Sequence, residues 1–145
     1  MKALCLRHLA RREYSRAELT QKLRFRGFAG VVVEDVLDEL VREGYLSDGR
    51  FAEGLIRRRM EQGYGLNRIR MELQQAGIDE RAVDVPSCDW EAVLEKTHHK
   101  KFGRLKPTSA RDFAARMRYL LQRGFAAEQI HRLLRRLEST EDHSD

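Results

Sequence analysis

Three glycine turns recur along the chain and constrain its fold more than any other sequence feature. Gly27-Phe28, Gly77-Ile78 and Gly124-Phe125 follow one another at intervals of 50 and 47 residues. Leucines stand four residues before the glycines, and branched apolar residues stand six residues after them: Leu23, Leu73, Leu120, Val33, Val83 and Ile130. This spacing gives the helices on both sides of each turn one apolar face. The sequence therefore predicts an all-α fold of three tandem repeats.

A capping box marks where one helix of the first repeat begins. The Ser15 side chain can accept a hydrogen bond from the backbone of Glu18, and the Glu18 side chain can reach back to the backbone of Ser15. The pattern predicts a helix that starts at Arg16 and ends at Gly27, which supplies a left-handed cap. Apolar spacing predicts one helix before it, at about residues 3–12, and one after it. Each repeat is therefore expected to hold three helices.

The repeats set the expected domain boundaries. We expect the first three-helix repeat at residues 1–46, the second at 47–88, the third at 89–137 and a frayed acidic tail at 138–145. The third helix of the second repeat should be short and end near Pro86, because proline cannot donate a helical hydrogen bond. Modules of this size are not very stable alone, so we expect them to stack end to end into an elongated, curved rod. The sequence leaves open whether the rod is right- or left-handed.

Composition excludes several classes of protein. No apolar run reaches the length of about 20 residues that a membrane-spanning helix needs, or the 7–15 residues of a signal-peptide core. The two cysteines, Cys5 and Cys88, form no CxxC or zinc-ligand spacing, and Cys5 at an inward helical position is expected to be a packed thiol. We therefore expect a reduced, cytoplasmic protein that binds no metal or cofactor and no membrane, and that is a monomer.

The charge pattern favours anionic partners. The net charge is +5, and twenty-two of the twenty-eight basic residues are arginine, which binds phosphate and carboxylate groups bidentately. The basic residues of the middle and last repeats fall into three sets: Arg57, Arg58, Arg59, Arg68 and Arg70; Lys96, Lys100, Lys101, Arg104 and Lys106; Arg111, Arg116, Arg118, Arg123, Arg132, Arg135 and Arg136. The first repeat instead carries an acidic strip: Glu34, Asp35, Asp38, Glu39 and Glu43. The strip leaves room for a protein partner with a basic patch.

Other candidate sites are weaker. His98 and His99 are neighbours in sequence and cannot both face one metal ion from a helix, so we expect a solvent-exposed pair. The glycines of residues 44–49 lack the lysine and hydroxyl residue of a phosphate-binding loop. Tyr64, between two glycines, is the one aromatic side chain outside the core spacing that merits a test of base stacking. Nothing in the sequence assembles a catalytic site.

Three stretches resemble one known family. The first is Leu9-Ala10-Arg11-Arg12-Glu13-Tyr14-Ser15-Arg16-Ala17-Glu18-Leu19 with Lys22-Leu23 and Gly27-Phe28; the second is Asp48, Arg50-Phe51-Ala52, Arg57, Gly63-Tyr64-Gly65, Arg68-Ile69, Leu73 and Gly77; the third is Arg123-Gly124-Phe125 with Ile130. They resemble the three repeats of the RecX family, the regulators of the RecA recombinase. The resemblance implies a non-enzymatic protein that binds along the groove of a RecA filament on DNA. There it would damp ATP hydrolysis, strand exchange and repressor cleavage.

Two alternatives to this function remain. The basic residues can be solvated helix faces that form weak local ion pairs, each worth about 0.3–0.5 kcal/mol. The protein can also be a direct, helix-turn-helix-like DNA binder, although no helix shows the Asn, Gln and Arg face of specific base recognition. The RecA filament is the expected partner, with weak, salt-sensitive binding to single- or double-stranded DNA as a further possibility. The candidate partner- or nucleic-acid-binding residues are Arg57, Arg58, Tyr64, Arg68, Arg70, Arg104, Arg111, Arg116, Arg132, Arg135 and Arg136.

Overall fold

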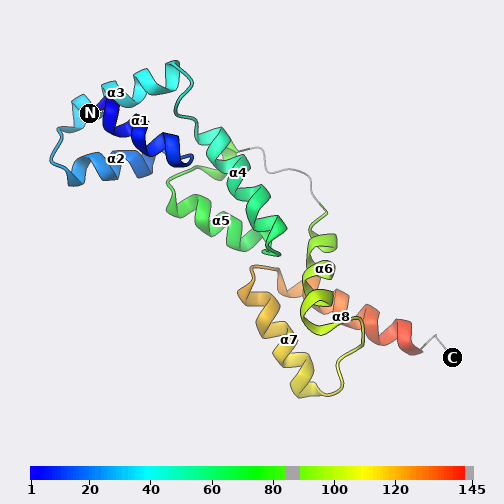
Figure 1. The fold of residues 1–145 in the computed structure, drawn as a ribbon. Helices are drawn as coiled ribbons and strands as arrows, with labels where there is room; N and C mark the ends of the chain where they lie inside the picture. The colour runs from blue at the N-terminus through cyan, green and yellow to red at the C-terminus, as the bar shows by residue number, and fades with distance from the viewer. Residues whose placement is uncertain (84–88, 143–145) are drawn as a thin grey trace. The chain divides into compact units, whose positions relative to one another are not determined.

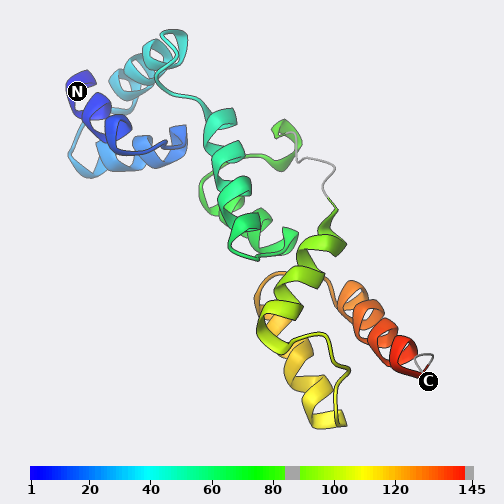
Figure 2. The ribbon, with the colours of Figure 1, turned by 45° about the vertical axis from the view of Figure 1, so that its right-hand side comes forward.

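A computed structural model describes residues 1–83 and 89–142. Within these ranges every regular element is a helix, which confirms the all-α class (Figures 1 and 2). The elements are α1 (Lys2–Arg11), α2 (Arg16–Phe25), α3 (Gly30–Arg42), α4 (Asp48–Glu61), α5 (Leu66–Gln75), the 3-10 helix η1 (Glu80–Ala82), α6 (Trp90–Phe102), α7 (Ala110–Gln122) and α8 (Ala127–Asp142). No helix in the described ranges has both the length and the apolar composition needed to cross a membrane.

The chain divides into two compact units, and the division falls inside the α4–α5 hairpin. Unit 1 contains Met1–Ile56 and Glu72–Val85, and unit 2 contains Arg57–Met71 and Pro86–Asp145. The beginning of α4 and the end of α5 therefore belong to unit 1, whereas the turn that joins the two helices belongs to unit 2. One part of the middle repeat thus belongs to unit 1 with the first repeat, and the other part belongs to unit 2 with the last repeat.

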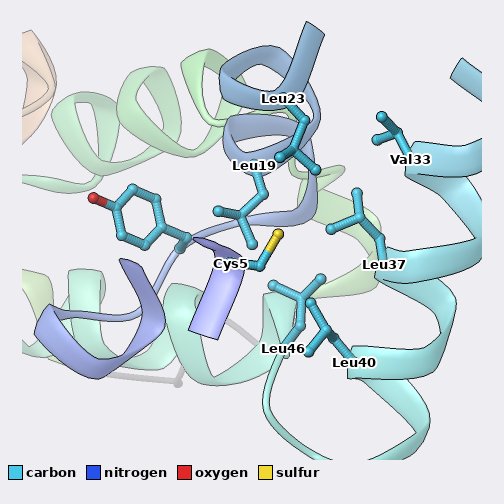
Figure 3. Packing of buried hydrophobic residues seen from close by; sticks show 8 residues of the cluster. Cys5, Leu19, Leu23, Val33, Leu37, Leu40 and Leu46 are labelled. Carbon is cyan, nitrogen blue, oxygen red and sulfur yellow. The ribbon is translucent and has the colours of Figure 1, made fainter. Parts of the chain in front are cut away.

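The core of unit 1 forms where α1, α2 and α3 meet. Cys5 is fully buried among leucines that include Leu19, Leu40 and Leu46, as Figure 3 shows, so the prediction of a packed thiol is confirmed. The capping box is also present. The Ser15 hydroxyl accepts from the Glu18 backbone at 3.1 Å, and the Glu18 carboxylate accepts from the Ser15 backbone at 2.9 Å.

A joint connects the start of α2 to the glycine turn that follows α5. The Ser15 hydroxyl donates to the carbonyl of Ala76 at 2.7 Å, and both groups are buried. Gly77 has a φ of +74° and lies so close to α2 that a Cβ atom there would be 2.5 Å from the Cβ of Ala17. The glycine therefore serves the turn and the close helix approach together.

The same joint occurs in unit 2 between the start of α5 and the turn between α7 and α8. The backbone amide of Gly65 donates to the carbonyl of Arg123 at 2.8 Å, and that of Asn67 donates to Gly124 at 3.0 Å. Gly124 has a φ of +97°, and a Cβ atom there would be 2.5 Å from the Cβ of Arg68. In both units the second helix of one repeat begins against the glycine turn of the next repeat.

The core of unit 2 comes from α6, α7 and α8, which pack against one another. Its buried residues are Leu94, Leu120, Phe125, Ile130, Leu133 and Leu134. Leu137 packs on this core, and α8 runs on to Asp142, although the sequence predicts a frayed tail from residue 138. Packing of Leu137 and the ion pair of Arg135 with Glu138, at 3.4 Å, support the longer helix.

The third helix of the middle repeat is present as η1. Asp79 caps it by accepting a hydrogen bond from the backbone of Arg81 at 2.9 Å. The expected end of this helix near Pro86 lies outside the described residues, as do Cys88 and residues 143–145 of the expected tail.

Candidate functional site

The turn between α4 and α5 is the centre of the candidate site. Gly63 leaves α4 with a φ of +82°, and the backbone amide of Tyr64 donates to the carbonyl of Arg59 at 2.9 Å. A Cβ atom on Gly65 would lie 2.5 Å from the carbonyl oxygen of Gly124, so only glycine permits this approach. The joint with the α7–α8 turn therefore holds Tyr64 in a fixed position.

Arg123 binds the end of α4 and covers the Tyr64 ring. Its guanidinium donates to the carbonyls of Gln62 and Gly63, the latter at 3.3 Å, where a positive charge is favourable because the helix dipole is negative there. The same guanidinium lies 3.9 Å from the centre of the Tyr64 ring, and that of Arg68 lies 5.1 Å from it. One aromatic ring therefore holds two cations through cation–π contacts.

A first hollow opens beside this ring. It has a volume of about 420 Å³ and is lined by Arg59, Gln62, Tyr64, Arg68 and Arg123. Three of the five lining residues are arginines, and none is acidic. Guanidinium groups placed around one hollow can bind phosphate or carboxylate oxygens bidentately.

A second hollow, of about 470 Å³, lies on α6 and shares Arg123 with the first. Its lining residues are Met60, Glu61, Gln62, Gly63, Val93, Lys96, Thr97, Lys100, Lys101, Tyr119 and Arg123. The three lysines recur at helical spacing on α6, and the ammonium of Lys101 lies 5.3 Å from the Tyr119 ring. Glu61 is the only acid among these lining residues. We refer to the residues that line the two hollows as the Arg123 site.

The structure brings together only part of the predicted set. Tyr64 and Arg68 line the first hollow, and their neighbour there is Arg59 rather than Arg57 or Arg58. The remaining exposed arginines of the set line neither hollow: Arg57, Arg58, Arg70, Arg104, Arg111, Arg132, Arg135 and Arg136.

Two of those exposed arginines have acidic partners on their own unit. Arg132 pairs with Glu91 at 2.7 Å, and Arg135 pairs with Glu138 at 3.4 Å. Such surface pairs contribute little to stability, and they reduce the positive charge that a partner would meet. The α8 arginines are therefore weaker candidates than the Arg123 site.

Arg116 is buried, with 5% of its surface exposed. Its guanidinium donates to the carbonyl of Leu105 at 2.7 Å and pairs with the carboxylate of Asp112 at 3.0 Å. These bonds hold the segment between α6 and α7 against α7. Because the side chain is buried and its donors are used inside unit 2, we do not carry Arg116 into the proposed binding surface.

The prediction of a solvent-exposed histidine pair is wrong for His98, which is fully buried. His98 lies at helical spacing from Leu94 and Phe102 on the face of α6 that meets α7. Its Nε2 atom accepts a hydrogen bond from the Arg116 guanidinium at 3.2 Å. Burial, together with the positive charge of Arg116, lowers the pKa of His98 to about 4, so the ring is neutral at pH 7.

The predicted candidate residues omit Arg123 and the three lysines of the Arg123 site. The sequence does carry a signal for Arg123, because an arginine precedes the repeat glycine at both Arg26 and Arg123. Lys96, Lys100 and Lys101 have no such fixed position relative to a repeat glycine, so the sequence does not single them out. Their position depends on how α6 packs beside the α4–α5 turn.

Family models match the chain in three segments. The model of the first three-helix domain of RecX matches residues 2–40, that of the second matches residues 47–84, and that of the third matches residues 89–134. The three matches follow the order of the glycine turns.

Relatives of this chain carry the same family name. The chain is 45% identical over 130 residues to the Regulatory protein RecX of Pseudomonas entomophila, a match that covers 87% of this chain and 84% of the relative. It is 45% identical over 132 residues to the Regulatory protein RecX of Acidithiobacillus ferrooxidans, with 91% and 87% covered.

One solved structure has the same fold. The crystal structure of RecX from Lactobacillus salivarius matches with a TM-score of 0.74 over 94% of each chain, at 18% sequence identity. Together with the three domain matches and the relatives at 45% identity, this places the sequence firmly. The chain belongs to the RecX family of regulatory proteins.

Proposed function

We propose that this protein regulates homologous recombination and DNA repair by binding the nucleoprotein filament of the RecA recombinase. It inhibits ATP hydrolysis, strand exchange and the co-protease activity of the filament. The protein acts by binding rather than by catalysis, and it opposes the subunit movements that ATP turnover requires. Family membership supports this role, since the relatives are named regulatory proteins.

The observation that carries the proposal is the arrangement of cations in the Arg123 site. Three arginines surround Tyr64 in one hollow, and three lysines line the adjoining one. A filament on DNA presents phosphate groups and acidic side chains, and both are ligands for these cations. Arg123 lines both hollows, and the hydrogen bond from the Gly65 amide to its carbonyl, at 2.8 Å, holds its backbone in place.

Contacts from several repeats strengthen the binding. When one repeat is bound to a filament subunit, the next repeat meets a neighbouring subunit at high effective concentration. Weak individual contacts then combine into stable binding. One regulator can affect more than one recombinase subunit, so inhibition is expected below equimolar amounts.

The test is DNA-dependent ATP hydrolysis by RecA that has been preassembled on single-stranded DNA. We expect hydrolysis to fall well before one regulator is present per recombinase subunit. Lys100→Glu reverses a charge in the second hollow and should raise the half-inhibitory concentration by about tenfold, equivalent to roughly 1.4 kcal/mol. Arg118→Glu is the matched control, because this exposed arginine on α7 lines neither hollow.

Three results would contradict the proposal. Undisturbed hydrolysis at saturating regulator would remove the filament as the target. Equal effects of Lys100→Glu and Arg118→Glu would show that overall charge, rather than the Arg123 site, governs binding. Tight, sequence-selective binding to bare duplex DNA would favour the helix-turn-helix alternative instead.

A further inference from the structure

Unit 1 carries a second basic surface, on helices other than α3, which holds most of the acidic strip. It is formed by α1 and α2 around His8. Four cations act on this histidine: Arg7 and Arg11 from α1, and Lys22 and Arg26 from the α2 segment and its end. Burial and then these positive charges lower the pKa of His8. The Tyr14 ring brings the two helices together here, because the centre of the His8 ring on α1 lies 5.5 Å from it and the ammonium of Lys22 on α2 lies 5.7 Å from it.

These cations are not neutralised by nearby carboxylates. Within the described part of the chain, Arg7, Arg11 and Arg26 form no ion pair, and the Lys22 ammonium only lies 5.7 Å from the Tyr14 ring. Arg12 is different, because it pairs with Glu18 at 3.2 Å. The surface therefore keeps most of its positive charge for an external anion.

The acidic residues of unit 1 are partly neutralised on a different helix. Glu39 on α3 and Glu43, the C-cap residue of that helix, both bind the ammonium of Lys2, at 2.7 and 3.0 Å, and Asp38 pairs with Arg16 at 2.7 Å. These three carboxylates are thus paired with cations other than the four around His8.

An exposed aromatic side chain adjoins the cations. Phe25 has 84% of its surface exposed, the highest value among the large apolar residues of the described ranges. It stands three residues after Lys22, so these two side chains are neighbours on the surface of α2, and Arg26 follows it as the C-cap residue of that helix. The apolar side of α2 is already buried through Leu19 and Leu23, so Phe25 has no role in the core.

We propose that the α1–α2 surface of Arg7, Arg11, Lys22, Arg26 and Phe25 binds single-stranded nucleic acid. The cations bind successive phosphates, and a base stacks on Phe25. A positively charged track with an aromatic platform is the chemistry by which proteins bind single strands without sequence preference. A duplex keeps its base faces stacked inside, so it can use the cations but not the ring of Phe25.

This binding is separate from the proposed action on the recombinase, and the test uses the full chain without any recombinase. The probe is a fluorescent oligothymidylate of about 16 nucleotides, and the comparison is a duplex of the same length. Anisotropy is followed over a range of salt concentrations. A failure of filament regulation would leave these measurements unchanged.

Charge variants test the phosphate contacts. Arg26→Glu should weaken binding of the oligothymidylate by about tenfold and reduce the slope of log affinity against log salt by about 0.7, the value for one phosphate contact on a single strand. Arg42→Glu makes the same charge change at an exposed position on α3 and should leave both quantities unchanged.

Variants of Phe25 test stacking. Phe25→Ala and Phe25→Leu should each weaken single-strand binding by about tenfold, whereas Phe25→Tyr should retain it. Duplex binding should not respond to any of the three. Because the side chain is exposed, these substitutions leave the core of unit 1 intact.

The histidine supplies an independent readout by NMR. Saturating oligothymidylate places phosphate charge beside His8 and should raise the pKa of its imidazole. The resonances of His131 on unit 2 should not move.

Several outcomes would overturn the proposal. These are equal losses from Arg26→Glu and Arg42→Glu, unchanged binding in Phe25→Ala, and an unmoved His8 titration. If Arg26→Glu weakens inhibition of the recombinase but leaves oligothymidylate binding intact, the surface contacts a protein instead, and the proposal is wrong.

Discussion

His98 links the stability of unit 2 to pH through one side chain. Its ring is buried beside the Arg116 guanidinium, and its pKa is lowered to about 4 in the folded protein. In the unfolded chain the pKa returns to about 6.5. The unfolded state therefore binds more protons below pH 6.5, and the stabilisation present at pH 7 is lost as the pH falls towards 4.

We predict that the free energy of unfolding of unit 2 falls by up to about 3 kcal/mol between pH 6.5 and pH 4 because of His98. Urea unfolding at a series of pH values measures this decrease in the free energy of unfolding. His98→Gln can still accept from Arg116 and should show a smaller decrease, whereas His131→Gln, at an exposed position on α8, should behave like the natural protein. An unchanged pH dependence in His98→Gln would refute the assignment.

Single residues also mark where sequence reasoning reaches its limit. The burial of Cys5 follows from helical periodicity, which holds within one helix. The burial of His98 and Arg116 depends on how α6 and α7 face each other, and two polar residues at those positions give no apolar signal. Arg123 is a similar case, since its contacts with Gln62 and Gly63 join segments about sixty positions apart in the chain.

The joints, in which the second helix of one repeat meets the glycine turn of the next repeat, connect the repeats. Gly124 is a demanding position, because an added Cβ atom would lie 2.6 Å from the backbone nitrogen of Arg68. Backbone cannot move aside as a flexible side chain can. The substitution therefore adds a steric clash to the conformational cost of a positive φ.

We predict that Gly124→Ala destabilises unit 2 by more than about 2 kcal/mol, measured by urea unfolding. Gly27→Ala is the matched control, because Gly27 ends α2 with the same turn hydrogen bonds that Gly124 makes after α7. Gly27 also has a positive φ, +85°, but nothing lies within 4 Å of its added Cβ, so the substitution should destabilise unit 1 by only about 1 kcal/mol. Equal costs for the two variants would show that the joint does not require close approach.

The helices were largely predictable, and the joints were not. The capping box predicts the start of α2 at Arg16, and the structure confirms it. The recurring glycines predict the turns, because a left-handed cap is a local requirement. Nothing local indicates that Gly77 and Gly124 also contact the second helix of the preceding repeat, because that contact depends on residues far away in the sequence.

At the scale of the whole molecule, the division into two units predicts how the protein opens. Each unit has its own core, and Leu37 is fully buried in that of unit 1. Leu37→Ala should cost about 2–5 kcal/mol. We expect faster amide hydrogen exchange in α1–α3 while exchange in α7 and α8 stays unchanged. Equal acceleration in both units would show that the chain opens as one cooperative body.

The two sides of the joint are different, because one side is the start of a helix and the other is a glycine turn. The middle repeat supplies both sides, its glycine turn to the first repeat and its helix start to the last, much as a monomer in a polymer carries two unlike reactive ends. Around Gly27, by contrast, the space where a Cβ would stand is open to 4 Å. Duplication of one module within a gene would therefore lengthen such a protein through copies of the same two contact surfaces.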